Sequence, residues 1–270
     1  MITFPNSKIN LGLHITRKRP DGYHDIETVF YPIHLNDAFE IAETNDVLEF
    51  TATGIEVPVD DSNLSLKAYK LLKKDFPDIP PVKMHLHKAI PTGAGLGGGS
   101  SDGAYALTLF NTAFHLNLTQ RKLFDYAYQL GSDCPFFILN KPALAKGRGE
   151  ILKELNIDLK GHILILINPR ISISTKWAFS QITPNPVIHE LQNIIYRPLE
   201  EWKEFLINEF EEPIFQKYPE IGQIKTTLYN NGAIYASMSG SGSTVFGIFK
   251  EDTFDISLID SNFFIRKIML

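Results

Sequence analysis

The chain has 270 residues, and 44% of them are hydrophobic, which is enough for one large or two modest globular domains. Its formal net charge is −5, without a run of lysine or arginine, and this argues against a general nucleic-acid binder. The single cysteine, Cys134, excludes an intrachain disulfide, and the absence of a signal pattern and of a long apolar run predicts a cytoplasmic protein without a membrane span.

The first half of the chain mixes strand and helix patterns. A strand is predicted over 9–15, where aliphatic residues alternate with polar ones, and Asp21 and Gly22 predict a turn before a second strand over 29–33. Further expected elements are strands at 39–42, 48–51, 82–86 and 136–139, and helices at 63–74, 104–110 and 119–131.

The second half has a pattern of its own. It predicts strands at 162–167, 233–238 and 244–249, a helix capped by Ser174 or Thr175, and helical segments at 199–207 and 219–230. Because strands and helices mix without regular alternation, the fold class expected is α+β. We expect two domains, 1–155 and 156–270.

The most informative segment is 93–99, which holds five glycines in seven residues. Glycine lets backbone N–H groups approach a ligand closely, and a helix that begins directly after such a loop adds its positive end. Ser100 stands where a P-loop would have lysine, and Asp125, the acid that a dinucleotide-binding fold would need, falls inside a predicted helix. The strand, loop and helix therefore predict a phosphate site of another type, and a plain flexible linker is the less favoured alternative.

Three polar residues suggest chemistry, although each also has an ordinary structural interpretation. Lys8 and Asn10 share one face of the first predicted strand, where polar side chains are usually just solvated. Asp133 follows Gly131 and Ser132, where an aspartate commonly caps a turn. The functional alternative for Asp133 is a general base that takes the proton of a substrate hydroxyl.

Two further segments suit a nucleotide. Tyr23 and His24 follow the predicted turn and are either edge residues or a stacking site for a nucleobase. The glycine–serine loop, residues 239–243 with the sequence Ser-Gly-Ser-Gly-Ser, is either a flexible hairpin or a second set of N–H and hydroxyl donors that face the substrate phosphates. The eight histidines show no paired metal spacing, so no transition metal held by the protein is expected.

Residues 91–102 closely resemble the signature of the GHMP small-molecule kinases, which bind ATP through such a loop. The resemblance implies a two-domain fold, with an N-terminal domain like the second domain of ribosomal protein S5 and a ferredoxin-like C-terminal domain. It implies ATP and Mg²⁺ as cofactors, with Ser101 as a possible Mg²⁺ ligand. The residues implied to bind ATP are Pro91, Thr92, Gly93, Ala94, Gly95, Leu96, Gly97, Gly98, Gly99, Ser100 and Ser101, together with Asn63 and Lys88 at the adenine.

Within this family, the Lys-x-Asn strand and the Asp-Gly-Tyr-His turn resemble the members that phosphorylate the 2-hydroxyl of 4-diphosphocytidyl-2-C-methyl-D-erythritol in non-mevalonate isoprenoid biosynthesis. The resemblance implies a catalytic role for Lys8 and Asp133. It assigns substrate contacts to Asn10, Tyr23, His24, Thr175 and Phe179. The segment 146–150 also resembles a family segment, to which no role beyond shape is assigned.

The expected partner is thus a small cytidine diphosphate substrate, without nucleic acid or membrane, and the expected state is a monomer or weak homodimer. A mevalonate, homoserine or galactose-type kinase is the alternative within the family, and Tyr23 and His24 argue against it because those substrates have no cytosine. A regulatory nucleotide-binding module without catalysis is the alternative from another class. The presence of both Lys8 and Asp133 argues against that module.

Overall fold

The structure, a computed structural model, describes residues 1–184 and 190–270. Two compact units form, each from several segments of the chain. The first unit comprises Met1–Ser7, His34–Thr92 and Gly97–Lys141, and the second comprises Lys8–Ile33, Gly93–Leu96 and Pro142–Leu270. The second unit takes residues from both sides of residue 155, and the domain boundary expected there stays a prediction.

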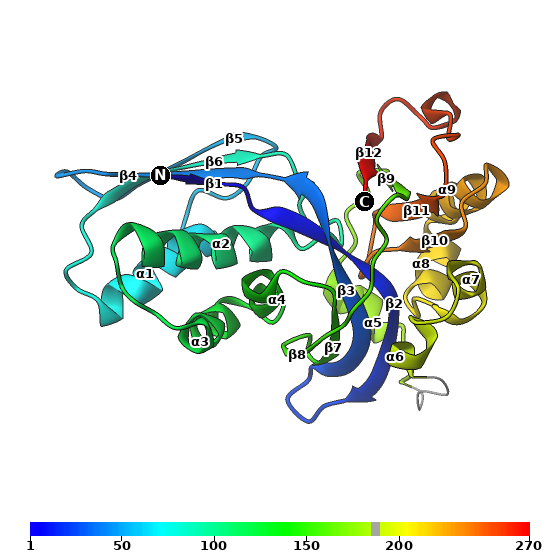
Figure 1. The fold of residues 1–270 in the computed structure, drawn as a ribbon, viewed down its shortest axis with the longest axis horizontal. Helices are drawn as coiled ribbons and strands as arrows, with labels where there is room; N and C mark the ends of the chain where they lie inside the picture. Colours follow the sequence, from blue (N-terminus) through cyan, green and yellow to red (C-terminus); the bar gives the residue numbers. More distant parts are fainter. Residues whose placement is uncertain (185–189) are drawn as a thin grey trace. The chain divides into compact units, whose positions relative to one another are not determined.

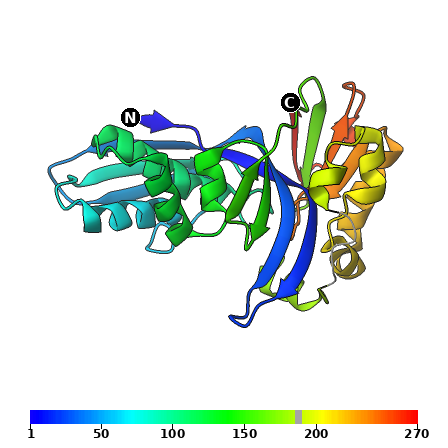
Figure 2. The same cartoon turned by 60° about the horizontal axis from the view of Figure 1, so that its bottom comes forward.

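The first unit is a four-stranded sheet with helices packed on one face (Figures 1 and 2). The sheet has the order β1-β4-β6-β5, in which β4 pairs antiparallel and β5 pairs parallel with β6. Its strands are β1 (Ile2–Thr3), β4 (Ala38–Glu43), β5 (Glu49–Gly54) and β6 (Val82–Lys88). Its helices are α1 (Leu64–Asp75), α2 (Gly98–Ala113), α3 (Gln120–Leu130) and α4 (Cys134–Leu139).

Local sequence explains why these elements form. In β6, Val82, Met84 and Leu86 are buried while the residues between them are less so, which is the alternation of a strand with one face on a core. Asn63 caps α1 by accepting a hydrogen bond from the N–H of Ser65. Strand β6 ends at Lys88, shortly before the glycine loop (93–99), and α2 begins at Gly98, within that loop.

The second unit has two sheets and several short helices. One sheet has the order β2-β3-β7-β8, with a long curved hairpin of β2 and β3 (Figure 2), and the other has the order β10-β11-β9-β12. The strands are β2 (Asn6–Lys18), β3 (His24–Asn36), β7 (Ala143–Gly147), β8 (Ile151–Glu154), β9 (Ile163–Asn168), β10 (Tyr235–Met238), β11 (Val245–Phe249) and β12 (Phe264–Met269). The α-helices are α5 (Thr175–Ser180), α6 (Leu191–Ile194), α7 (Trp202–Phe205), α8 (Glu211–Lys217) and α9 (Pro219–Asn230), with 3-10 turns at Leu199–Glu201 and Ile256–Leu258.

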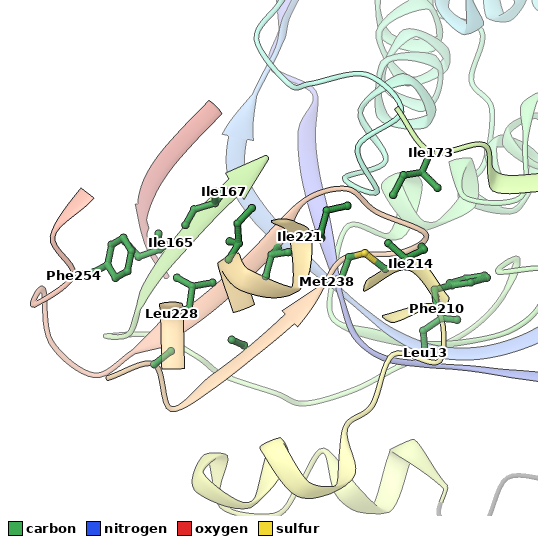
Figure 3. Close-up of a cluster of buried hydrophobic side chains, with 14 of the residues drawn as sticks. Leu13, Ile165, Ile167, Ile173, Phe210, Ile214, Ile221, Leu228, Met238 and Phe254 are labelled. Carbon is green, nitrogen blue, oxygen red and sulfur yellow. The ribbon is translucent and has the colours of Figure 1, made fainter. Parts of the chain in front are cut away.

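An apolar cluster packs strands against helices in the second unit (Figure 3). It combines Ile165 and Ile167 of β9 with Ile221 and Leu228 of α9, and Leu13 of β2 joins them. Each buried aliphatic side chain contributes on the order of 1.5–3 kcal/mol to folding. Strand β2, which also contains Lys8 and Asn10, is thus fixed in the core of this unit.

Most predicted elements are confirmed. The strands expected at 9–15, 82–86 and 162–167 are present, and the helix predicted over 219–230 has the same bounds as α9. The fold is α+β, as expected. Among the described residues, no helix is both long and apolar enough to cross a membrane.

One predicted strand is wrong. The apolar run 136–139 lies in helix α4 (Cys134–Leu139), because Pro135, which lacks an N–H, fits the first turn of a helix and a short apolar run does not by itself distinguish helix from strand. The helical segment predicted over 199–207 is present only in part, as a 3-10 turn followed by α7 (Trp202–Phe205).

Candidate functional site

The glycine loop leads directly into the N-terminus of α2. Gly93, Gly95 and Gly97 have φ of 61°, 79° and 71°, a left-handed conformation that favours glycine. Gly97 precedes the first residue of α2, no side chain caps the helix, and its first turn contains no acidic residue. The N–H groups of Gly98, Gly99 and Ser100 therefore have no intrahelical partner, and with the helix dipole they form a positive end suited to an anion.

In the second unit, three segments singled out in the sequence lie in contact. The hydroxyl of Ser239 donates a hydrogen bond of 2.8 Å to the carbonyl of Gly95 and accepts one of 3.2 Å from the N–H of Asn10. The N–H of Lys8 donates to the carbonyl of Leu96 at 3.0 Å. Strand β2, the first part of the glycine loop and the glycine–serine loop thus share one hydrogen-bonded arrangement.

The two polar residues of β2 contact each other. Lys8 is only 4% exposed, so its side chain is not simply solvated. Its Nζ lies 2.5 Å from Oδ1 of Asn10 and 4.9 Å from the ring centroid of Phe30. Nδ2 of Asn10 donates to the hydroxyl of Thr28 at 2.9 Å. Holding a lysine ammonium below the surface in a fixed orientation suits a role in charge stabilisation.

Two residues without any local sequence signal, Asn208 and Glu211, contact the glycine–serine loop (239–243) and the residue before it. Asn208 is buried, and its Nδ2 donates to the carbonyls of Met238 and Gly240 at 2.7 and 2.8 Å. Glu211 accepts a hydrogen bond of 2.8 Å from the N–H of Met238. Their partners lie about thirty residues away in the chain, so a local sequence pattern does not reveal these contacts.

In the first unit, a buried charged cluster lies beside the start of α2. Nζ of Lys88, which is 1% exposed, lies 2.5 Å from Asp37 and 2.6 Å from Asp102. Asp37 also accepts hydrogen bonds from the N–H groups of Ala89 and Ile90. Burial raises the pKa of Asp102 to about 7, against the favourable charge of Lys88. The Lys88 side chain is committed to two carboxylates, so a contact with adenine would be left to its main chain and stays a prediction.

Other predicted residues of the first unit have identifiable places. Asp133 immediately precedes α4, and its side chain does not cap that helix. Burial raises the pKa of the neighbouring Cys134 thiol to about 12, so it is a packing residue and not a nucleophile. The side chain of Asn63, besides capping α1, donates to the carbonyl of Pro58 at 3.0 Å. The roles assigned to Asp133 and Asn63 stay predictions.

Aromatic side chains gather at the turn before β3. The rings of His24 and Phe179 are stacked with centroids 4.9 Å apart and an interplanar angle of 15°. Tyr23 is 53% exposed, and the guanidinium of Arg148 lies 3.8 Å from its ring centroid. Burial, and secondarily the charge of Lys18, lowers the pKa of His24 below its ordinary value, so its imidazole is neutral at pH 7.

Thr175 is the remaining predicted substrate residue. It begins α5, whose cap is Ser174, and its Oγ1 lies 3.3 Å from the hydroxyl of Ser241 in the glycine–serine loop. The start of α5 therefore joins the glycine–serine loop, and the same helix contains Phe179. The contact of Phe179 with His24 and that of Thr175 with the loop are observed, while their roles in binding stay predictions.

Comparison with known proteins shows the family of this chain. Family models for the GHMP kinases N terminal domain and the GHMP kinases C terminal match residues 63–141 and 188–255. A 4-diphosphocytidyl-2-C-methyl-D-erythritol kinase from Bacteroides fragilis is 53% identical over 93% of both chains. The chain belongs to the 4-diphosphocytidyl-2-C-methyl-D-erythritol kinase family. It is therefore a small-molecule kinase of the GHMP type.

Further relatives extend the match. The kinase of the same name from Cytophaga hutchinsonii is 49% identical over 94% of this chain and 95% of its own. A crystal structure of 4-(cytidine 5'-diphospho)-2C-methyl-D-erythritol kinase superposes with a TM-score of 0.78 at 30% identity, covering 92% of this chain and 90% of its own. Mevalonate kinase from Methanococcus jannaschii, at 14% identity and a TM-score of 0.73 over 100% of this chain and 98% of its own, shares the fold.

Proposed function

We propose that this kinase transfers the terminal phosphoryl group of ATP to the 2-hydroxyl of 4-diphosphocytidyl-2-C-methyl-D-erythritol. The observation that supports this substrate over those of other GHMP kinases is the stack of His24 on Phe179 beside Tyr23. Aromatic faces bind a nucleobase by stacking, and a neutral histidine offers one donor and one acceptor to its polar edge. Substrates without a base would leave this cluster unused.

For ATP, we propose that the glycine loop and the N-terminus of α2 bind the phosphates. The absence of a side-chain cap and of acidic residues in the first turn of α2 supports this. Oγ of Ser101 is buried and has no hydrogen-bond partner among the described residues, which fits a group that completes its contacts with a bound ligand. Ser101 would hold Mg²⁺, whose chemical contribution when bound is to neutralise phosphate charge.

For the transfer itself, we propose that Asp133 accepts the proton of the substrate hydroxyl while Lys8 stabilises the negative charge of the transferring group. A buried ammonium held by Asn10 is oriented before the substrate arrives, and such preorganisation is effective in catalysis. Asn10, Tyr23, His24, Thr175 and Phe179 would orient the substrate. The cytoplasmic location and the monomeric or weakly dimeric state stay predictions.

The role of Asp133 can be tested by replacing it with asparagine. We expect Asp133→Asn to reduce the rate of phosphoryl transfer by about 10²- to 10⁴-fold, because the amide cannot accept the proton. The measurement is phosphorus NMR of the product formed from ATP, Mg²⁺ and the cytidylyl substrate. Asp125→Asn, an exposed aspartate on α3, is the control. A rate for Asp133→Asn within a few-fold of wild type would show that Asp133 is not the base.

The nucleobase preference can be tested by competition. We expect CMP and CDP to compete with the cytidylyl substrate and UMP to compete poorly. Stacking alone does not separate the two bases, so the preference must come from groups at the polar edge of the base, such as His24. Inhibition constants from a coupled kinase assay provide the measurement. Equal inhibition by cytidine and uridine nucleotides would refute the proposed pocket.

A further inference from the structure

An arginine outside the predicted site residues lies at the aromatic cluster. Arg148 is in the turn between β7 and β8, and β7 pairs with β3 so that Gly147 lies opposite Ile26. This register brings the turn beside Tyr23, and the guanidinium of Arg148 lies 3.8 Å from the tyrosine ring centroid. Stacking on an aromatic ring fixes the plane of a guanidinium and leaves its N–H groups directed outward along the edge.

Local contacts and two glycines fix the conformation of this turn. The side chain of Glu150 accepts a hydrogen bond of 2.6 Å from the backbone N–H of Arg148. Gly147 and Gly149 have φ of 70° and 118°, so the turn uses two conformations that favour glycine. Glu150 is thus engaged with the main chain, and it positions Arg148 without pairing with its charge.

The other arginines near this turn are already paired. Arg17 lies 2.6 Å from Asp25, and Arg19 lies 3.0 Å from Asp21 and 2.9 Å from Asp25. The carboxylates of Asp21 and Asp25 therefore already form ion pairs with Arg17 and Arg19. Within the described part of the chain, no carboxylate is in ion-pair contact with Arg148.

The positive charge of Arg148 therefore lies beside the proposed base site without an ion-pair partner among the described residues, although it is close enough to Asp21 to help lower the pKa of that carboxyl. Lys18 adds a second cation, close enough to His24 to lower its pKa. A planar guanidinium with free edge donors is the group best suited to two oxygens of a phosphate. A cytidine diphosphate substrate has its diphosphate one ribose away from the base, which is the distance an arginine next to the base can reach.

We propose that Arg148 is a specificity residue that binds the diphosphate of the cytidine diphosphate substrate while its face stacks on Tyr23. This inference rests on the proposed function, because it takes Tyr23, His24 and Phe179 as the base site. It assigns the base and the diphosphate of the substrate to different side chains. Loss of Arg148 should therefore affect ligands with phosphates far more than the nucleoside.

The test compares cytidine with CDP by isothermal titration calorimetry on the full chain. We expect Arg148→Ala and Arg148→Gln to weaken CDP binding by about 10- to 100-fold, the range for hydrogen bonds to a charged group. Cytidine affinity should change by less than about 3-fold, since it has no phosphate. Arg148→Lys keeps the charge but not the planar fork, and should give an intermediate CDP affinity. Thermal melting verifies that each variant is folded.

Arg266→Ala is the matched control, because Arg266 makes the same kind of contact with Phe264, at 4.5 Å, on β12. It should leave the ratio of CDP to cytidine affinity unchanged. The CDP affinity of wild type should also fall more steeply with salt than that of Arg148→Gln, since one phosphate contact is lost.

Two outcomes would overturn the inference in different ways. If wild type prefers CDP to UDP but Arg148→Ala and Arg148→Gln leave the ratio of CDP to cytidine affinity unchanged, the role of Arg148 is refuted and the proposed function stands. If wild type binds neither cytidine nor CDP, the proposed base site fails and the inference fails with it.

Discussion

At the scale of single residues, the buried cluster of Lys88, Asp37 and Asp102 has the clearest energetic consequence. Two carboxylates share one ammonium, and one oxygen of Asp102 has no hydrogen-bond partner among the described residues. A second negative charge in such a site is poorly compensated, because burial penalises it more than Lys88 stabilises it. Asp102 therefore keeps its proton up to about pH 7.

This predicts a specific dependence of stability on pH. The folded-state pKa of Asp102, about 7, is higher than its ordinary value of 3.8, so the folded protein binds this proton more tightly than the unfolded chain does. The resulting stabilisation is complete below about pH 4 and is lost as pH rises through about 7. Asp102→Asn, which resembles the protonated form at every pH, should not suffer this loss, and it should raise the free energy of unfolding at pH 8 by an amount on the order of 1–4 kcal/mol.

Urea unfolding of both proteins between pH 5 and 8 provides the measurement. The difference between the two unfolding free energies isolates Asp102, because other titrating groups are common to both proteins. The variant should gain relative stability as the pH rises. Parallel profiles of the two proteins across this range would contradict the account of Asp102.

At the scale of elements, the glycine loop is shaped by close packing as well as by backbone conformation. A Cβ on Gly95 would lie 1.9 Å from the carbonyl oxygen of Ser239, whereas a Cβ on Gly93 or Gly99 would meet no atom within 4 Å. Gly93 shares the left-handed conformation of Gly95, and Gly99 lies in the first turn of α2. Comparing the three positions therefore separates two reasons for glycine, which are the left-handed backbone conformation and the lack of space for a Cβ.

Alanine substitutions should follow this order. Gly95→Ala should destabilise the fold most, because it adds a clash with Ser239 to the cost of a left-handed residue. Gly93→Ala should cost only the conformational part, about 1–2 kcal/mol. Gly99→Ala should be neutral or should stabilise the helix by up to about 1 kcal/mol. Chemical denaturation of the three variants gives the comparison, and equal stability of Gly95→Ala and Gly99→Ala would show that the loop rearranges freely.

At the scale of the whole molecule, local patterns predicted most elements but not their long-range contacts. Alternating hydrophobicity indicated β6, and a Pro at the start with a Gly beyond the end indicated α9, because both signals depend on neighbouring residues. The run 136–139 was misassigned because four apolar residues are too few to show a period.

The candidate site shows the same limit. The resemblance in the glycine loop selected the residues of the proposed phosphate site, but no local signal relates Arg148 to Tyr23. The same holds for Asn208, whose partners are two main-chain carbonyls of a distant loop. Such contacts depend on tertiary packing, and a single sequence does not contain the information about which turns lie side by side.

The chain passes from the second unit to the first between Leu96 and Gly97, inside the glycine loop. No single cleavage of the polypeptide would therefore release either unit with all its segments, and a fragment that lacks β2 would lose Leu13 from the apolar cluster. Neither unit can therefore be expressed alone as one continuous fragment, as is possible for proteins whose domains follow one another along the chain. Insertions and circular permutations are better directed to exposed turns away from the proposed site, such as the one at Asn45 and Asp46.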